Sequence, residues 1–478
     1  MNSTAPRLKC MTDQQTADLH EYSVKLLKTY GMRVEDPEIR RMLTQNGCQE
    51  KDDRVLFCDE LIERMLQAQQ QHVTLTSPVT GIKKEISLGS CLSHSTGGAP
   101  WIADMKTGKR SNATQEDLIA TIRIMNQLDN LDIPCALVYP SDVPSPITQL
   151  QQTVTMFEYS HKPIYGPGLS LAENAKYVAE LFKIYSGSSD LQENPIGMVG
   201  ISPEAPLFLP KHITDTTRYI AEAGIPISIL SAPMGGLTGP LSIAGTVAQC
   251  HAEILAYACV AFLFNPACVL IRGSRTFFAN MKNTQSILGL PETGISSAIS
   301  AQLGSYCGMM SDVYGISCTS CAMDEQAGYE KMMGGLLPAL AGASLITGFG
   351  STASVMCASL SQLVLDDEIV GMIKKSLRPS LIDEDELGFE AIGCVVNDHE
   401  TFMEQEHTIE HLHDEIFTPS IGFDSVWAEW ISTGEVPLTE RAQERAVELL
   451  AKDEIIPVKP EIRAEVDKLM DSARRELL

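Results

Sequence analysis

Arginine and aromatic residues stand where a short apolar segment ends, a position at which barrel enzymes place their chemistry. Arg272 and Arg275 flank the end of segment 267–273, and Phe277 and Phe278 follow them. The arginine fork matches the two oxygens of a carboxylate or phosphate, and aromatic faces attract a quaternary ammonium. The pattern therefore points to a site for a small ligand with both charges, although either arginine could instead form a surface ion pair.

A run of acidic and polar residues, 324–330, follows another apolar segment. Glu325 or Tyr329 could reach a cavity and attract a cation. The alternative is that the acids stabilise the N-terminus of a helix, where the helix dipole favours negative charge. The acidic run 366–368 admits the same two interpretations, and we favour the helix-stabilising one.

Two further patterns resemble metal or redox sites. Cys318 and Cys321 form a C-x-x-C motif, but no second pair stands at zinc-site spacing and no thioredoxin-like context surrounds it. His407 and His411 lie one helical turn apart, but the glutamate that follows the first histidine in metalloproteases is missing. We expect no metal in this chain.

Short apolar segments alternate with helical patterns from about residue 90 onwards, which is typical of βαβ units and a parallel sheet. Helices are expected at Thr114–Leu128, Leu171–Tyr185, Lys211–Ala223 and Leu241–Phe264. No glycine-rich dinucleotide loop follows the first strand. Strands are expected at 93–104, 134–139, 163–167, 195–202, 226–231, 267–273, 311–318 and 343–349. Eight such strands predict a closed (β/α)₈ TIM barrel.

The sequence patterns at the two ends of the chain differ from those of the barrel, because they are mainly helical. Residues 1–90 carry helical patterns, one of them over Pro37–Gln45, and predict an N-terminal helical cap. The barrel is expected over 91–400. Residues 401–478 predict a C-terminal helical extension packed on the barrel, with Thr439 as the N-cap of one helix.

Composition restricts the partners. The formal net charge of −25 would repel nucleic acid and an anionic membrane. The longest uninterrupted apolar run, Ile254–Phe264, is short for a membrane span, and the N-terminus has no signal-peptide pattern. Thirteen scattered cysteines indicate reduced thiols, so we expect a cytoplasmic protein. The oligomeric state is left open, a homo-oligomer included.

Several segments in order resemble the trimethylamine methyltransferase family. They are Ile225–Gly245, Gln249–Glu253, Leu290–Gly294, Met323–Glu330 and Leu365–Ile369, with outlying matches at Gly31–Asp36, His407–His411 and Trp430. The resemblance implies a (β/α)₈ barrel whose cavity binds a methylated amine and whose mouth docks a corrinoid protein. It implies no cofactor bound by this chain, because the corrinoid belongs to the partner.

Trimethylamine enzymes of this family carry pyrrolysine just after the seventh strand, and Cys321 stands nearest to that position here. The chain therefore resembles the branch that lacks pyrrolysine, which demethylates quaternary amines such as glycine betaine, proline betaine or carnitine. Cobalt(I) is a strong nucleophile, and a quaternary nitrogen leaves as a neutral tertiary amine. Catalysis would then need positioning and desolvation, with no covalent intermediate.

Nine residues are expected to bind the substrate. An arginine would hold a betaine carboxylate, aromatic residues would enclose the ammonium, glutamates would add negative charge, and Gln326 and Tyr329 would shape the cavity. In order these are Trp101, Tyr139, Glu204, Arg272, Arg275, Glu325, Gln326, Tyr329 and Phe349. Two alternatives remain: another barrel enzyme that uses general acid/base chemistry, and a betaine-binding protein without turnover.

Overall fold

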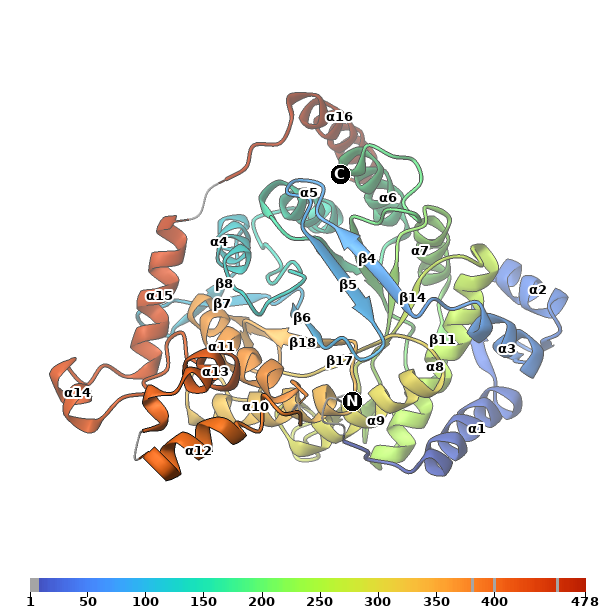
Figure 1. Cartoon of the computed structure of the whole chain (residues 1–478). Helices are drawn as coiled ribbons and strands as arrows, with labels where there is room; N and C mark the ends of the chain where they lie inside the picture. Colours follow the sequence, from blue (N-terminus) through green and yellow to red (C-terminus); the bar gives the residue numbers. More distant parts are fainter. Residues whose placement is uncertain (1–7, 380–381, 399–400, 453–454) are drawn as a thin grey trace.

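A parallel β-sheet forms the centre of the computed structural model, which describes residues 8–379, 382–398, 401–452 and 455–478 (Figure 1). Its seven strands lie in the order β6-β18-β17-β14-β12-β10-β9. They are β6 (Leu92–Ser95), β9 (Ile164–Leu169), β10 (Gly197–Ile201), β12 (Ile227–Ser231), β14 (Leu270–Ser274), β17 (Ser311–Tyr314) and β18 (Leu345–Phe349).

Segment 133–138 closes the sheet between its two outer strands. Ile133 bridges to His94 of β6, and Cys135 bridges to Tyr165 of β9, both in parallel orientation. Pro134 has no N–H to give to a ladder, which accounts for single bridges in place of a continuous strand. The predicted TIM barrel is thus confirmed, with an irregular second strand.

Helices surround the sheet on its outer side (Figure 1). They follow the strands in chain order as α4 (Gln115–Asn126), α5 (Thr148–Tyr159), α6 (Ala172–Ser186), α7 (Lys211–Glu222), α8 (Ile243–Phe264), α9 (Pro291–Tyr306), α10 (Glu325–Leu340) and α11 (Leu360–Ser376). The four helices predicted in this region are confirmed to within two residues at each end. Thr114 caps α4 by accepting a hydrogen bond from the Asp117 amide, which shows how one of these helices starts.

Helix α8 is long and apolar enough to cross a membrane, but 89% of its most apolar window is buried inside the protein. The polar side chains Gln249, His251 and Glu253 interrupt its apolar sequence and are buried with hydrogen-bond partners. Buried polar groups with partners are typical of a helix packed inside a globular fold. We therefore interpret α8 as a core helix of the barrel.

A β-hairpin closes the N-terminal end of the barrel. Strands β4 (His72–Thr76) and β5 (Lys83–Ser87) pair antiparallel and cross this end in Figure 1. Leu75 and Ile86 of the hairpin are fully buried in one cluster with Ile271 and other side chains of the barrel interior. In the part of the chain that the structure describes, the hairpin thus covers this end and leaves the opposite end for ligand entry.

The N-terminal region is less purely helical than expected. It contains α1 (Asp13–Thr29), α2 (Pro37–Gln45) and α3 (Asp59–Gln67), but also five strands. Besides the hairpin, these are β1 (Met32–Val34), β2 (Gln49–Lys51) and β3 (Arg54–Leu56), and β1 pairs with β11 (Phe208–Leu209) from the barrel. Strands this short and polar leave little period-two signal in the sequence.

Short strands build the open, C-terminal end of the barrel. The expected strand 93–104 is two strands, β6 and β7 (Trp101–Ala103), because Gly97 and Gly98 turn the chain between them and Gly98 has a φ of +78°. β7 lies in a sheet with β8 (Arg110–Asn112), β19 (Ser351–Thr352) and β20 (Cys357–Ala358). A second small sheet joins β13 (Met234–Gly235), β15 (Phe277–Ala279) and β16 (Ser286–Ile287).

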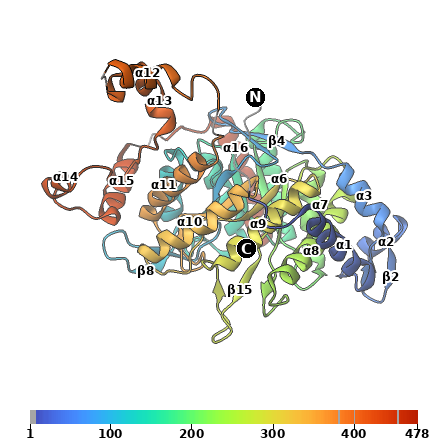
Figure 2. The same ribbon diagram turned by 60° about the horizontal axis from the view of Figure 1, so that its bottom comes forward.

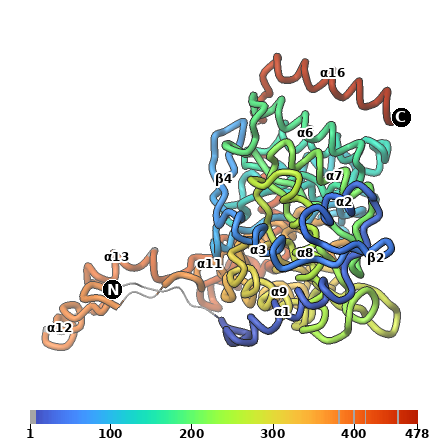
Figure 3. The backbone as a smooth tube through the Cα atoms, turned by 90° about the vertical axis from the view of Figure 1, so that its right-hand side faces the viewer, coloured from blue at the N-terminus to red at the C-terminus, as the bar shows by residue number. Residues whose placement is uncertain are grey.

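The C-terminal region is helical, as predicted. Helix α15 (Leu438–Lys452) packs on α11 and α4, and α16 (Pro460–Leu477) packs on α6. Figures 2 and 3 show α12 (Phe389–Asp398) and α13 (Glu406–Glu415) standing away from the barrel. Helix α14 (Trp427–Ser432) and the 3-10 turns Ser145–Ile147 and Phe402–Glu404 complete the elements. Thr439 is not the N-cap, because α15 already begins at Leu438.

Candidate active site

A cavity of about 360 Å³ opens at the C-terminal end of the barrel strands. This is the end at which TIM barrels hold their active sites. Strand ends and the loops after them supply its wall: His94, Ser95, Thr96, Gly97, Gly98, Cys135, Ala136, Tyr139, Gln149, Gln152, Tyr165, Gly166, Pro167, Gly168, Ser202, Leu230, Ala232, Arg275, Tyr314, Thr347 and Val355. None of these residues is an aspartate or a glutamate.

A buried carboxylate, Asp312 of β17, organises the floor of this cavity. Its Oδ2 accepts hydrogen bonds from Arg275 (2.6 Å), from the Ser228 hydroxyl (2.8 Å) and from the Tyr165 hydroxyl (3.2 Å). Its Oδ1 lies 2.9 Å from Nε2 of His94. Four strands of the barrel therefore meet at one carboxylate.

Charge governs the ionisation of this floor. Burial alone would raise the pKa of the Asp312 carboxyl, but Arg275 and His94 outweigh burial and hold that pKa well below its usual range. Burial and the neighbouring Asp312 carboxylate together raise the pKa of Tyr165 well above its ordinary value. Asp312 is thus a carboxylate and Tyr165 a neutral phenol at neutral pH.

Aromatic and amide side chains form the wall above the floor. Tyr139 and Tyr314 are half-buried there, and the Arg275 guanidinium lies 5.5 Å from the centroid of the Tyr314 ring. Gln149 and Gln152 of α5 are oriented by hydrogen bonds to the carbonyl oxygens of Gly168 and Val138. The cavity therefore offers aromatic faces and fixed dipoles above a charged floor.

Two of the nine residues expected from the sequence, Tyr139 and Arg275, line this cavity. Arg272 does not, because it points the other way. Ile271 belongs to the barrel interior, so Arg272, next to it in strand β14, faces the surrounding helices. Arg272 is fully buried there and donates to the carbonyl oxygen of Ser300 on α9.

The other expected residues lie outside the cavity. Trp101 is in the small sheet at the mouth, where the Arg110 guanidinium lies 4.1 Å from its ring centroid. Glu204 is exposed in the loop after β10, and Phe349 is fully buried in the hydrophobic core. A shift in register between Thr347 and Phe349 turns the end of β18, so the strand pattern alone does not give the direction of Phe349.

The acidic run after the seventh strand stabilises structure. Asp324 caps α10 by accepting a hydrogen bond from the Ala327 amide. Glu325 and Tyr329 are exposed, and Gln326 donates to Glu330. These positions correspond to the helix-stabilising interpretation and not to a cavity wall.

The acidic run after the last strand is structural as well. Asp366 pairs with Lys331 at 2.9 Å, and both side chains are fully buried. Asp367 accepts a hydrogen bond from the Asn130 backbone amide, and Glu368 accepts from the backbone of Ser420.

Sequence reasoning missed His94, Tyr165, Asp312 and Tyr314. All four lie within segments that were predicted as strands, and each is a polar residue in an otherwise apolar or small-residue strand. A polar residue in a buried strand is itself a signal of a buried site. The sequence could not tell which of them face the same side, because register fixes that.

Comparison with known proteins agrees with this architecture. The family model described as trimethylamine methyltransferase (MTTB) matches residues 1–477. The chain belongs to the trimethylamine methyltransferase family. Trimethylamine methyltransferase MttB of Methanosarcina barkeri is 27% identical over 475 residues, which cover 98% of this chain and 95% of that protein.

A second relative is named for a different substrate. Glycine betaine methyltransferase of Desulfitobacterium hafniense strain Y51 is 27% identical over 482 residues, which cover 100% of this chain and 99% of that protein. The solved structure of the hydroxylamine MtmB complex aligns with a TM-score of 0.53 at 12% identity, covering 94% of this chain and 89% of that chain. At that identity the likeness shows the fold alone.

Cys321, the position we matched to pyrrolysine in the family, is exposed in the loop after β17. Cys318 of the same C-x-x-C motif is buried, and burial raises the pKa of its thiol to about 11. Glu330 holds this loop by accepting hydrogen bonds from the amides of Thr319 and Ser320. The two thiols have separate surroundings and share no hydrogen bond in the described structure.

The histidine pair outside the barrel is a stacked surface pair. The rings of His407 and His411 lie 4.1 Å apart, and His411 is near Asp385 and Glu386 at 3.8 and 3.9 Å. The parallel rings place their nitrogens side by side, so they do not converge on one point.

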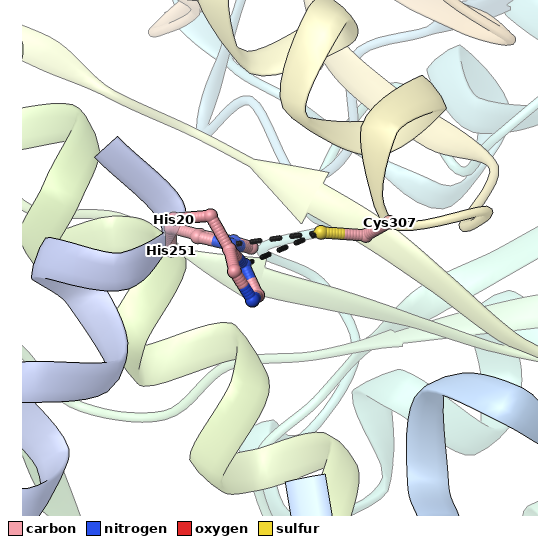
Figure 4. Close-up of side chains that lie close together, drawn as sticks. All are labelled: His20, His251 and Cys307. Atoms are coloured by element: carbon pink, nitrogen blue, oxygen red, sulfur yellow. Dashed lines mark hydrogen bonds between the residues drawn. The ribbon is translucent and has the colours of Figure 1, made fainter. Parts of the chain in front are cut away.

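A different cluster, which the sequence did not reveal, brings His20 of α1, His251 of α8 and Cys307 at the end of α9 together (Figure 4). Nδ1 of His20 lies 3.0 Å from Nε2 of His251, and Sγ of Cys307 lies 3.6 and 3.8 Å from these nitrogens. Tetrahedral zinc would space two nitrogens by about 3.3 Å and sulfur from nitrogen by about 3.6 Å. The spacing alone therefore resembles a zinc site.

Arg272 decides against that interpretation. Its Nε donates to Nδ1 of His251 at 3.3 Å, and a guanidinium cannot accept a hydrogen bond. The hydrogen of His251 is therefore on Nε2, the atom that a metal would need, and it is donated to His20. Burial, together with Arg272 and His20, keeps the pKa of His251 well below its ordinary value, so the His251 imidazole is neutral at neutral pH.

Proposed function

We propose that this enzyme transfers a methyl group from a quaternary amine to the cobalt(I) of a corrinoid protein and releases the tertiary amine. The observation that carries the proposal is the barrel-end cavity, in which tyrosine rings stand above a floor that contains Arg275. Membership of the trimethylamine methyltransferase family supports methyl transfer from an amine. The relative named glycine betaine methyltransferase supports a quaternary substrate.

Methyl transfer from a quaternary amine would require the chain to bind and orient the substrate. The cobalt(I) electron pair would form the new bond to the methyl carbon, and the breaking C–N bond would leave its electron pair on nitrogen. The product amine is neutral, so no proton has to be delivered to it. The residues of the cavity would orient the ammonium in line with the incoming cobalt and exclude water.

Each cavity residue has a part in this scheme. The faces of Tyr139 and Tyr314 would hold the methylated ammonium by cation–π attraction. Arg275, which keeps donors beyond those given to Asp312, would hold a substrate carboxylate. The corrinoid protein would dock at the mouth, because the cavity opens at that end of the barrel. Glycine betaine, proline betaine and carnitine all fit this description.

The two alternatives have less support. A barrel enzyme with general acid/base chemistry needs a base poised near neutral pH. Asp312 is fully buried beneath the residues that line the cavity, and the donors that cover it keep its pKa low, which makes it a poor base. A betaine-binding protein without turnover would use the same cavity and is distinguished only by assay.

The test is a methyl-transfer assay with purified protein, a reduced corrinoid protein and a panel of methylated amines, followed by the absorbance of methylcobalt. We expect a quaternary amine to react and trimethylamine not to react. Tyr139→Leu should raise the apparent KM about three- to tenfold, because the cation–π contact is lost. The matched variant at an exposed position, Tyr329→Leu, should leave the apparent KM unchanged. No turnover with any amine and any corrinoid acceptor would contradict the proposal.

A further inference from the structure

We propose that His94 is a buried imidazolium, which gives the cavity floor a net positive charge that selects a substrate carboxylate and turns the methylated ammonium toward the mouth. The identity of the substrate rests on the proposed function, but the charge of the floor does not. His94 would thereby act as a specificity-determining residue for the substrate carboxylate.

The hydrogen bonds of His94 require two ring hydrogens. Nδ1 lies 2.9 Å from the carbonyl oxygen of Ser95, and Nε2 lies 2.9 Å from Oδ1 of Asp312. A carbonyl oxygen and a carboxylate can only accept. A neutral imidazole has a single N–H, so only the imidazolium satisfies both contacts. His94 is buried, so water does not replace either partner.

The groups around His94 leave its charge in excess. From the neighbouring elements it faces Asp312 of β17, Arg275 after β14, the phenol of Tyr165 on β9 and the thiol of Cys135. Tyr165 and Cys135 are neutral, since burial raises the pKa of both groups, that of Cys135 to about 12. Asp312 balances Arg275, and the positive charge of His94 remains.

An excess buried charge is costly until an anion pairs with it. The residues that line the cavity include no carboxylate, so the chain itself supplies no second anion there. A carboxylate of the substrate would supply it. The protein as a whole carries a net charge of −25, so this positive floor is a local feature that opposes the overall charge.

Arg275 provides the donors for such a carboxylate. Its Nη1 donates to the carbonyl oxygens of Ser274 and Asp312, and its Nη2 donates to the Asp312 carboxylate. A guanidinium has five N–H groups, so Nε and the second hydrogen of Nη2 remain for a ligand. These donors lie at the floor, beside the cationic pair that would attract the ligand.

The position of the aromatic residues then sets the orientation. Tyr139 is at the rim, where its hydroxyl lies 3.3 Å from the hydroxyl of exposed Ser145. Tyr165, by contrast, is buried at the floor and its hydroxyl is engaged by Asp312. A zwitterion with its carboxylate on the floor would place its methyl groups beside Tyr139, at the open end where the methyl acceptor must approach.

The experiment uses 3,3-dimethylbutanoate, the analogue of glycine betaine in which carbon replaces the quaternary nitrogen. It keeps the shape and the carboxylate but has no positive charge and no methyl group that can be transferred. Titration calorimetry on the full chain should detect binding of this anion, and choline, which has no carboxylate, should bind at least tenfold more weakly. His94→Gln should lower the affinity for the anion at least tenfold and should leave the affinity for choline within about threefold of the wild-type value.

A measurement on the wild-type protein guards against misfolding of the variant. Nitrogen-15 spectra of protein labelled at histidine should show one buried ring with hydrogens on both nitrogens at neutral pH, and this ring should shift when 3,3-dimethylbutanoate is added. Absence of such a ring, or equal binding of the anion to His94→Gln, would overturn the inference. Anion binding that depends on His94 without methyl transfer from any amine would instead overturn only the proposed function.

Discussion

Two buried histidine clusters lie on opposite sides of strand β14, and they differ in the sign of their partners. Inside the barrel, His94 meets Asp312, which also binds Arg275. In the helix layer, His251 meets Arg272, and among the described residues no ion pair joins this arginine to a carboxylate. The residue types are similar, but only the inner cluster contains an acid.

That single difference decides the ionisation of each cluster. A carboxylate partner lets His94 carry a charge, and the cluster becomes a receptor for anions. An arginine partner forces His251 to accept a hydrogen bond, and burial together with Arg272 and His20 lowers its pKa. The outer cluster is therefore a chain of hydrogen bonds in which the His251 imidazole is neutral and Arg272 carries the charge, and it connects α1 to α8 and to the end of α9 (Figure 4). Similar side chains thus form a binding site beside the carboxylate of Asp312 and a structural contact between helices beside Arg272.

The largest expected effect comes from removing that neighbour. Asp312→Asn leaves Arg275 and His94 buried without their counter-ion, and removal of one partner of a buried pair costs about 3–5 kcal/mol. Urea denaturation should show a loss of this size, and the exposed control Asp424→Asn should show almost none. A loss below about 1 kcal/mol for Asp312→Asn would mean that the inner cluster is not held together by its charge.

The two arginines of the clusters provide a matched pair. Arg275→Met should weaken the binding of a carboxylate-bearing quaternary amine about tenfold or more, because charged donors to the carboxylate are lost. Arg272→Met should leave the affinity within about twofold, since this side chain faces the helices. Calorimetric titration of both variants tests the pair, and the reverse order of effects would show that the assignment of the two faces is wrong.

The outer cluster should make the free energy of unfolding depend on pH. Folded His251 stays neutral because its pKa is lowered, whereas the unfolded chain takes up a proton below pH about 6.5. The unfolded state then binds more protons, so the free energy of unfolding falls as the pH falls, by about 1 kcal/mol between pH 7 and 5.5. His251→Asn should remove this part of the pH dependence, and His72→Asn, at an exposed position, should keep it. Identical pH dependence in wild-type protein and His251→Asn would contradict a neutral buried His251.

The smallest effect is expected from metal ions. Because Nε2 of His251 carries its hydrogen, zinc added in slight excess should bind below stoichiometric amounts, and a chelator should leave the melting temperature unchanged. Elemental analysis of the purified protein measures the content directly. One zinc per chain that is lost in Cys307→Ser would show that the hydrogen bond from Arg272 yields to a metal.

The sequence was sufficient for the barrel, because alternating apolar strands and helices carry strong signals. The residues that line the cavity could not be predicted from the sequence to the same extent. Arg272 and Arg275 are equivalent in a linear pattern, and only the register of β14 shows that the first faces the helices. Phe349 lies at a strand end like Tyr139, but the irregular end of β18 buries it in the core. Asp312 and His94 lie 218 residues apart in the sequence, and only closure of the barrel brings them together.

A single-turnover reaction of glycine betaine with labelled methyl groups, the enzyme and a cobalt(I) corrinoid protein tests both methyl transfer and the carboxylate-binding floor. Mass spectrometry and absorbance would compare the amount of dimethylglycine with the amount of methylcobalt. We expect equal amounts of the two products and no product from choline under the same conditions. Transfer from choline at a comparable rate would contradict the carboxylate-binding floor, and no methylcobalt from glycine betaine, proline betaine or carnitine would contradict the methyl transfer itself.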